Sequence, residues 1–244
     1  MYQLNGLKKI PELIHGFSET KDGNMSFVWG ARDDVLASRK NFFLKIGAEG
    51  MNSVTAFLKH RTDIALVDAS FGGEDAMEAD CLMTNSKNVL LSILSADCLP
   101  VIIFDPLKSA LALAHLSRIN STRGFLRAII EKMKKIYGSN AEDVLVGIGP
   151  CIHKESYVFA EKEFKKRVPD EKIFDGFVSG LSDGRKAIDL PGYSVEELIS
   201  AGISGKNVEI SEVDTAQNTS FFSHYRSRIT GEQEGRMITV AGMV

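Results

Sequence analysis

The sequence predicts an α+β fold in a single domain that spans residues 1–244. Three apolar runs follow one another in the middle of the chain, with connections too short for crossover helices: Val89–Leu94, Leu99–Phe104 and Ser109–His115. Such runs are typical of buried strands joined as hairpins. Elsewhere strands and helices alternate irregularly, which favours α+β over a doubly wound parallel sheet. Because no internal repeat or break in composition marks a linker, we expect one domain.

Composition narrows the class of protein further. Lys and Arg number 29 against 32 Asp and Glu, so the net charge of -3 gives no support to a nucleic-acid or anionic-membrane partner. No apolar run approaches the roughly 20 residues that a membrane span needs, and the N-terminus lacks the apolar core of a secretory signal. Three cysteines are too few for a disulfide framework. We therefore expect a cytoplasmic, reduced protein. The expected assembly is a monomer or small homo-oligomer.

An amphipathic helix is expected in the N-terminal part of the chain. Asp33–Ile46 places its apolar residues mainly on one face, and Asp33 or Asp34 is the expected N-cap. Arg39, within this helix, has its simplest interpretation as a solvated charge. Before the helix we expect short edge strands in residues 1–16, a polar turn at Ser18–Gly23 and a strand at Asn24–Trp29.

A histidine separates two expected strand pieces, Val54–Leu58 and Ile64–Val67. This residue, His60, is the centre of a Lys-His-Arg triplet. On sequence alone, a lone histidine in such a place is more often a surface loop residue than a ligand. Phe71–Glu78 then reads as a Gly-rich acidic loop, and Asp80–Thr84 as a short strand.

The second half begins with a well-defined helix, Phe125–Tyr137. Its apolar residues recur at spacings of three and four, and Gly138 is the expected C-cap. The remaining elements are expected as a strand at Val144–Ile148, a helix at Tyr157–Arg167, a loop at Lys172–Arg185, a helix at Tyr193–Ala201, a strand at Val208–Val213, an aromatic and basic segment at Phe221–Arg228 and a closing strand at Met237–Val240.

An acid and a thiol interrupt the core strands. Asp97 and Cys98 lie between two buried runs, where a carboxylate needs partners, so Asp97 could orient a ligand or cap a local turn. If Leu99–Ala114 returns as a hairpin, His115 arrives at the same sheet edge as Cys98. Three interpretations stay open. They are a metal site of His60, Cys98 and His115, a cysteine hydrolase with Cys98 as nucleophile and His115 as base, and a buried thiol with structural histidines.

Other motifs are absent, and the two remaining cysteines carry no pattern. Neither GxGxxG nor GxxxxGK[ST] occurs, so the usual signatures of nucleotide-binding folds are missing. No GxSxG elbow of a serine hydrolase occurs either. Cys81 and Cys151 are expected to pack in the core or near it.

Several segments together resemble the YfiH family. They are EADCLMTN, ADCLPVIIFD, ALAH, VGIGPCI and FFSHYR with a later GR, in that order along the chain. Members of this family have been called multicopper polyphenol oxidase or laccase-domain proteins, purine nucleoside phosphorylases and peptidoglycan editing factors. The resemblance implies an α/β/β/α layered sandwich, similar to the catalytic domains of cytotoxic necrotizing factor toxins. The sequence departs from the family after His115, where Ser117–Asn120 replaces Gly-Trp-Arg-Gly.

The same resemblance implies a set of site residues. It places a metal on His60, Cys98 and His115, with Zn²⁺ as the expected cofactor and copper as the alternative. Arg39 matches an arginine of the family's pocket, where it would hold an anion such as phosphate. Asn24 matches an asparagine in the family's pattern and is assigned with Arg39 to substrate binding.

The implied activity is that of a zinc-dependent purine nucleoside enzyme. The reactions are phosphorolysis of adenosine, inosine, guanosine or methylthioadenosine, and deamination of adenosine, with Cys98, His115, Asp97 and Arg39 as catalytic residues. The partners would be a nucleoside and phosphate. The first alternative is hydrolysis of a peptidoglycan precursor at the same site, and the second is the Cys98–His115 hydrolase. Copper-dependent phenol oxidation and a binding protein without turnover rank below these.

Overall fold

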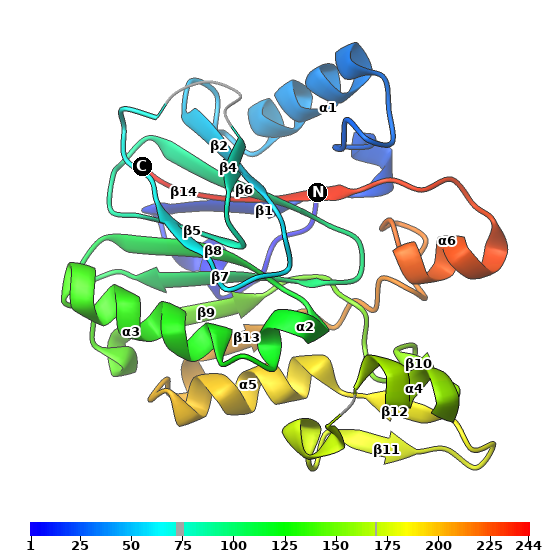
Figure 1. Ribbon diagram of the computed structural model, residues 1–244. Helices are drawn as coiled ribbons and strands as arrows, with labels where there is room; N and C mark the ends of the chain where they lie inside the picture. Colours follow the sequence, from blue (N-terminus) through cyan, green and yellow to red (C-terminus); the bar gives the residue numbers. More distant parts are fainter. Residues whose placement is uncertain (72–75, 169) are drawn as a thin grey trace.

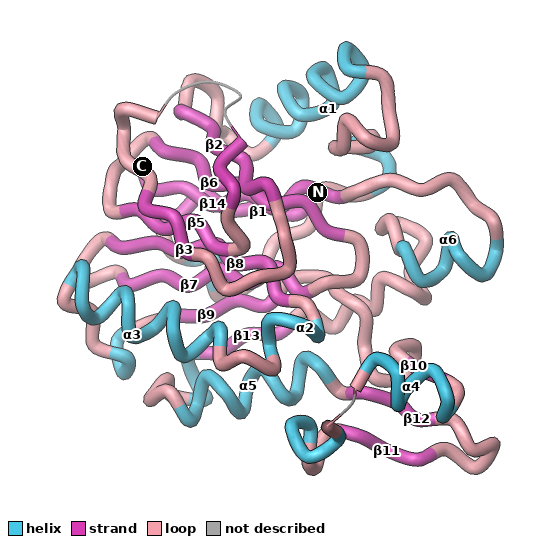
Figure 2. The backbone as a smooth tube through the Cα atoms, in the orientation of Figure 1, coloured by secondary structure: helices cyan, strands magenta, loops and turns pink. Residues whose placement is uncertain are grey.

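Two large β-sheets lie face to face, with helices on their outer sides (Figure 1). The computed structural model describes residues 1–71, 76–168 and 170–244. The first sheet has the strand order β1-β14-β6-β2-β4, and the second has the order β13-β9-β7-β8-β5-β3. A small third sheet, β10-β12-β11, lies at the end of the second sheet's helical layer (Figure 2).

The strands are short and come from all parts of the chain. Those of the first sheet are β1 Leu13–Phe17, β2 Asn52–Phe57, β4 Ala76–Glu78, β6 Val89–Ser95 and β14 Met237–Met243. Those of the second sheet are β3 Ile64–Leu66, β5 Cys81–Thr84, β7 Leu99–Asp105, β8 Ala110–Leu116, β9 Leu145–Ile148 and β13 Val208–Ile210. The small sheet consists of β10 Val158–Phe159, β11 Val178–Gly180 and β12 Lys186–Ile188.

The α-helices fall into two groups by the sheet that they cover. Their bounds are α1 Arg32–Lys45, α2 Arg118–Ser121, α3 Phe125–Tyr137, α4 Glu161–Arg167, α5 Leu190–Ser200 and α6 His224–Thr230. Helix α1 lies outside the first sheet, whereas α3 and α5 lie outside the second (Figure 1). None of the helices among the described residues has the length and apolar character needed to cross a membrane.

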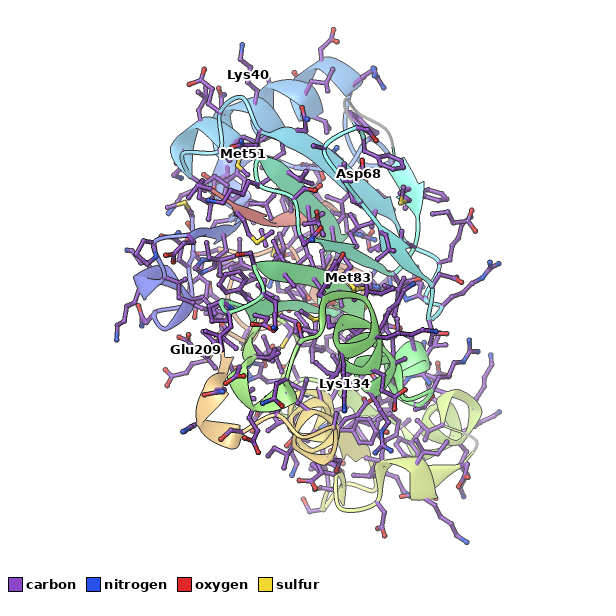
Figure 3. All side chains as sticks on the ribbon, turned by 90° about the vertical axis from the view of Figure 1, so that its left-hand side faces the viewer. Lys40, Met51, Asp68, Met83, Lys134 and Glu209 are labelled. Carbon is purple, nitrogen blue, oxygen red and sulfur yellow. The ribbon has the colours of Figure 1, made fainter. Side chains whose placement is uncertain are left out.

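The core strands are apolar on both faces because both faces are covered. Along β7, Ile102 and Phe104 face the first sheet, while Val101 and Ile103 face the helices. Each such side chain, fully removed from water, stabilises the fold by about 1.5–3 kcal/mol. Figure 3 shows side chains filling the space between the layers, with Met83 deep inside and Lys40 on the outer side of α1. The order of layers is thus helix, sheet, sheet, helix, as the resemblance implied.

Most of the predicted elements are confirmed. The hairpin return is present, because β7 pairs antiparallel with β8 over its whole length. Helix α3 has the predicted bounds and ends at Gly138, which has a φ of 70°. Helix α1 also forms, but the N-cap prediction is wrong: Ala31 occupies that position. Asp33 and Asp34 lie inside the first turn, where carboxylates favour the positive end of the helix dipole.

The strand predicted at Asn24–Trp29 is wrong, and this segment is a series of turns. The Asn24 side chain accepts a hydrogen bond from the Ser26 amide at 3.1 Å and donates one to the Ser26 carbonyl at 2.9 Å. An asparagine that bonds the backbone two residues ahead closes a turn in place of a ladder. The local side-chain bonds therefore outweigh the β-propensity of the apolar residues here.

Two helix starts and two loops also differ from the prediction. Helix α4 begins only at Glu161, because Val158–Phe159 pairs with β12. Helix α5 begins earlier, at Leu190, because the Asp189 carboxylate accepts the Gly192 amide at 2.8 Å. The segment predicted as the loop Lys172–Arg185 contains β11 and part of a 3₁₀ turn. The loop predicted at Phe71–Glu78 lies partly outside the described residues, and its last three residues form β4.

Candidate metal centre

The topology brings three segments to one edge of the sandwich. Strands β2 and β6 are parallel neighbours, so their C-terminal ends lie at the same edge. Each is followed by a connection that crosses to the second sheet; one contains His60 and the other contains Cys98. Strand β8 runs antiparallel to β7, and its His115 is opposite Pro100, near the start of β7. The sheet pairing alone therefore places these three side chains together.

The donor atoms of His60, Cys98 and His115 lie within 4.8 Å of one another. The two imidazole rings have centroids 5.0 Å apart and are inclined at 70°. His115 is buried, Cys98 is half-buried and His60 is exposed, so the cluster opens to solvent on one side. Two nitrogens and one sulfur with an open side fit a catalytic zinc site. In residues 1–71, 76–168 and 170–244, no other group of three such side chains could hold a metal ion.

A buried carboxylate, Asp80, organises this cluster. Its oxygens accept the backbone N–H groups of Lys59, His60 and Arg61 at 3.1, 3.0 and 2.8 Å. One of them also lies 3.1 Å from Nδ1 of His115. His60 has a φ of 55°, a backbone conformation that is costly for a residue other than glycine. The three hydrogen bonds from backbone N–H groups to Asp80 hold the loop in this conformation. A carboxylate on Nδ1 leaves Nε2 for a metal, the usual arrangement around a ligating histidine.

The electrostatics of the cluster follow from burial and charge. Burial by itself would lower the pKa of His115, but the adjacent Cys98 sulfur and Asp80 raise it to about 9. Burial and the neighbouring His115 lower the pKa of His60, and Asp80 opposes this shift. The pKa of Asp80 is lowered because its hydrogen bonds from His115 and the loop amides outweigh the effect of burial. Asp80 is therefore ionised at neutral pH, and its charge stabilises a cation beside it.

Asp97 lies next to the cluster but its carboxylate is bound elsewhere. One oxygen accepts the Thr215 hydroxyl at 2.7 Å, and the other accepts the Tyr225 amide at 2.6 Å. Asp97 has a φ of 84° and is 8% exposed. These contacts tie the turn before Cys98 to the C-terminal loops. Both partners are more than 100 residues away along the chain, so these bonds join distant segments instead of capping a local turn.

Arg39 and Asn24 also make bonds within the fold. Arg39 donates from Nε and Nη2 to the Met25 carbonyl at 3.0 and 2.7 Å, and its guanidinium lies 4.6 Å from the centre of the Phe27 ring. Asn24 accepts the Arg236 amide at 2.9 Å as well as closing its own turn. Both side chains thus support the 24–29 segment. Neither is among the described residues that line the cavity beside the His60–Cys98–His115 cluster.

That cavity has a volume of about 590 Å³, within the range of small-molecule sites. Trp29 and Phe57 give its wall aromatic surface, and Arg118, Arg167 and Arg236 give it positive charge, with the Arg236 guanidinium 5.4 Å from the centre of the Trp29 ring. The Ser95 hydroxyl in its wall is buried and has no hydrogen-bond partner among the described residues. The cavity can therefore take a planar apolar group and an anionic group at the same time. Its other lining residues are Ser26, Val28, Ala56, Leu58, His60, Leu94, Ala96, Cys98, His115, Ser117, Ile119, Tyr157 and His224.

The most important residue that the sequence prediction missed is Asp80. It lies inside the EADCLMTN segment, but a single acid before a strand is common on protein surfaces. Arg118, Arg167 and Arg236 were missed as wall residues for a similar reason, because they come from three distant segments. The aromatic and basic segment Phe221–Arg228 leads into and forms most of helix α6. It also contributes His224 to the cavity wall.

The chain thus has a mixed fold of helices and sheets with one His–Cys–His cluster, among the described residues, that could hold a metal ion. Residues 15–244 match the family described as multi-copper polyphenol oxidoreductase laccase. The chain belongs to this family, and a solved structure titled YfiH shares its fold. The resemblance seen in the sequence is thereby confirmed.

Relatives with assigned names are similar to nearly the whole chain. Purine nucleoside phosphorylase ORF3 of Streptomyces griseus is 27% identical, and the match covers 90% of this chain and 89% of that protein. Purine nucleoside phosphorylase YlmD of Bacillus subtilis is 25% identical over 95% of this chain and 89% of its own. A protein named adenosine deaminase RL5, from an unknown prokaryotic organism, is 24% identical over 84% and 80%. The names thus point to purine nucleosides in this family.

Solved structures share the fold at lower identity. The crystal structure of the hypothetical protein YfiH of Bacillus licheniformis matches with a TM-score of 0.83 at 24% identity, over 95% of this chain and 93% of that chain. YlmD of Geobacillus stearothermophilus matches with a TM-score of 0.83 at 23% identity, over 96% and 92%. The architecture described above is therefore the architecture of these proteins.

Proposed function

We propose that this protein is a zinc-dependent enzyme that acts on purine nucleosides by phosphorolysis, by deamination of adenosine, or by both. The observation that carries the proposal is the convergence of His60, Cys98 and His115 at the wall of a cavity of small-molecule size. The names of the family's relatives supply the substrate class.

Zinc is the metal that the donor set favours. Two imidazoles and one thiolate match a known set of catalytic zinc ligands. Copper, which also binds thiolate and imidazole, is the alternative metal. A zinc ion held there would act as a Lewis acid and provide hydroxide at neutral pH. His115 would be kept in the correct tautomer by Asp80, and the Asp80 charge would make the imidazole a better ligand.

The remaining walls can hold the substrate. Trp29 and Phe57 offer apolar surface to a purine ring, and the unpartnered Ser95 hydroxyl can bond to one of its edge atoms. The resemblance assigned the phosphate to Arg39. Since Arg236 is among the lining residues and Arg39 is not, we assign the phosphate of phosphorolysis to Arg236. Asp97 and Asn24 act as positioning residues in this proposal.

The proposal is tested by metal content and turnover measured together. Protein purified without added metal should contain about one zinc per chain, and His60→Ala should lose most of it. Adenosine and inosine should be converted with phosphate present, and adenosine alone should release ammonia if deamination occurs. Lys59→Ala, a change of the exposed neighbour, should retain both the metal and the activity. Full turnover in a metal-free His60→Ala protein would refute the metal-dependent mechanism.

A cysteine hydrolase is the second candidate, and one observation favours it. Cys98, His115 and Asp80 lie in the order of a nucleophile, a base and an orienting carboxylate, with the Asp80–His115 bond at 3.1 Å. This mechanism needs no His60. It therefore predicts activity in His60→Ala and rapid inactivation by thiol alkylation. Editing of a peptidoglycan precursor could use either mechanism and would appear as amide-bond cleavage in product analysis.

Two further interpretations rank below these. Copper-dependent phenol oxidation needs several copper ions, and the described residues offer one cluster. A binding protein without turnover would bind nucleosides and release them unchanged. The similarity to cytotoxic necrotizing factor catalytic domains stays a prediction.

A further inference from the structure

A basic groove adjoins the cavity beside the His60–Cys98–His115 cluster. It has a volume of about 470 Å³. Arg118, Ile119 and Arg167 line both the groove and the cavity, so the two spaces adjoin through shared walls. The groove is completed by Thr122, Arg123, Glu163 and Lys166.

The charge of this groove is unbalanced. Its lining holds four cationic side chains and one carboxylate, Glu163, which bonds to Arg167 at 2.6 Å. Within the described part of the chain, Arg118, Arg123 and Lys166 form no ion pair with a carboxylate. A concave surface with such an excess of one sign attracts ligands of the other sign. The groove is therefore suited to an anion.

Arg118 is fixed at the junction of groove and cavity. Its Nη1 donates to the Arg167 carbonyl, while its Nε is buried and without a partner in the described residues. The turn that carries it is closed by Asn120, which accepts the Ser117 amide at 2.7 Å and donates to the His115 carbonyl at 2.9 Å. The guanidinium is thus held close in sequence and space to a metal ligand. Since Arg118 lines the groove, the outer N–H groups of its guanidinium can donate charge-assisted hydrogen bonds to a phosphate oxygen there.

The two sides of the cavity set the direction of a bound ligand. Trp29 and Phe57 belong to the 26–29 and 56–58 segments, where Arg236 lies over the Trp29 ring, whereas Arg118 and Arg167 are shared with the groove. A ligand with its planar ring on the apolar side therefore points its other end toward the groove.

We infer that the substrate is a nucleoside whose sugar carries a phosphoryl group, with the nucleoside in the metal cavity and the phosphoryl group in the basic groove. This inference rests on the proposed function, because it takes the nucleoside to occupy the cavity. It adds a second phosphate position, held by Arg123 and Lys166 with Arg118, which is separate from the phosphate consumed in phosphorolysis.

Calorimetric titration of the full metal-loaded chain tests the inference. The probes are adenosine, adenosine 5′-monophosphate and inorganic phosphate, each alone. We expect the monophosphate to bind at least about tenfold more tightly than adenosine, since two or three charge-assisted bonds are added. Arg123→Gln/Lys166→Gln should abolish this preference and leave the adenosine affinity unchanged. The matched control, Lys135→Gln/Lys162→Gln, removes the same charge from exposed positions on α3 and α4 outside the groove and should keep the preference.

The other results would overturn the inference. One is equal affinity for adenosine and its monophosphate. Another is an equal loss of the preference for the monophosphate in both double variants. The third is inorganic phosphate that binds as tightly as the monophosphate. The last result would show that the groove takes free phosphate. Failure of the proposed function looks different: no nucleoside would be turned over, while binding of the monophosphate would still depend on Arg123 and Lys166. Turnover of adenosine without a preference for the monophosphate would refute this inference and leave the proposed function standing.

Discussion

Oδ1 of Asp80 lies 3.1 Å from Nδ1 of His115, while the same carboxylate accepts three backbone amides of the loop that carries His60. One buried side chain therefore positions two of the three proposed metal ligands, one in the loop between β2 and β3 and the other in β8. Cys98, the third ligand, is positioned separately by the turn at Asp97.

Asp80→Asn should weaken metal binding by about 10- to 100-fold, because the amide lacks the charge that supports the imidazole and the loop. Competition with a zinc-binding dye measures the affinity. Asp105→Asn is the matched control, since Asp105 is also buried and accepts the Leu107 and Lys108 amides at the other end of β7. Equal zinc affinities for the wild type and Asp80→Asn would show that this carboxylate does not support the ligands.

Removal of the metal should destabilise the wild type. A ligand that binds only the folded state stabilises it by about 2.7 kcal/mol at a concentration of 100 Kd, so a chelator should lower the Tm by about 5–10 °C. Cys98→Ser should already have the lower Tm and should respond little to the chelator. The same chelator-induced shift in both proteins would mean that the bound metal lies elsewhere.

Asp97→Ala should destabilise the fold by about 2–4 kcal/mol, because the Thr215 hydroxyl and the Tyr225 amide lose their acceptor and alanine fits poorly at a φ of 84°. Urea denaturation gives this value. Asp97→Asn keeps an acceptor and tolerates the backbone, so it should be milder and retain turnover. A folded Asp97→Asn protein with no turnover would instead support the catalytic role implied by the resemblance.

Acid should destabilise the protein through His15 in β1. This side chain is fully buried, its Nε2 accepts the Leu4 amide at 3.0 Å, and burial lowers its pKa to about 4. An unfolded histidine titrates near 6.5, so between these values only the unfolded state takes up the proton. The contribution of His15 to the free energy of unfolding should therefore be fully present above pH 6.5. The free energy of unfolding should fall by about 3 kcal/mol as the pH drops to 4. Urea midpoints across this range measure the loss.

His15→Gln, which can still accept the Leu4 amide, should be less stable at neutral pH but should lose this part of the acid dependence. An unchanged pH profile in His15→Gln would assign the acid sensitivity to other groups.

Elements with strong local patterns could be predicted from the sequence. The run Phe125–Tyr137 repeats its apolar residues with helical spacing, and β7 and β8 are apolar throughout and closely spaced. The segment at Asn24 could not be predicted, because side-chain hydrogen bonds decided it against the apolar pattern. The start of α4 depended on pairing between β10 and β12, which are 27 residues apart and show no local signal.

The sequence by itself determined the family, through a motif order that resembles it, and that resemblance predicts two histidines and a cysteine as the site. It also determined the α+β class, because hydrophobic period and connection length are local properties. Only the tertiary structure decided that Asp80 holds two ligands, that Asp97 bonds away from the cluster, and that Arg118, Arg123 and Lys166 face a shared groove. Those relationships join residues from separate strands, helices and loops. They depend on the pairing of two sheets and the direction of each side chain, which no short stretch of sequence encodes.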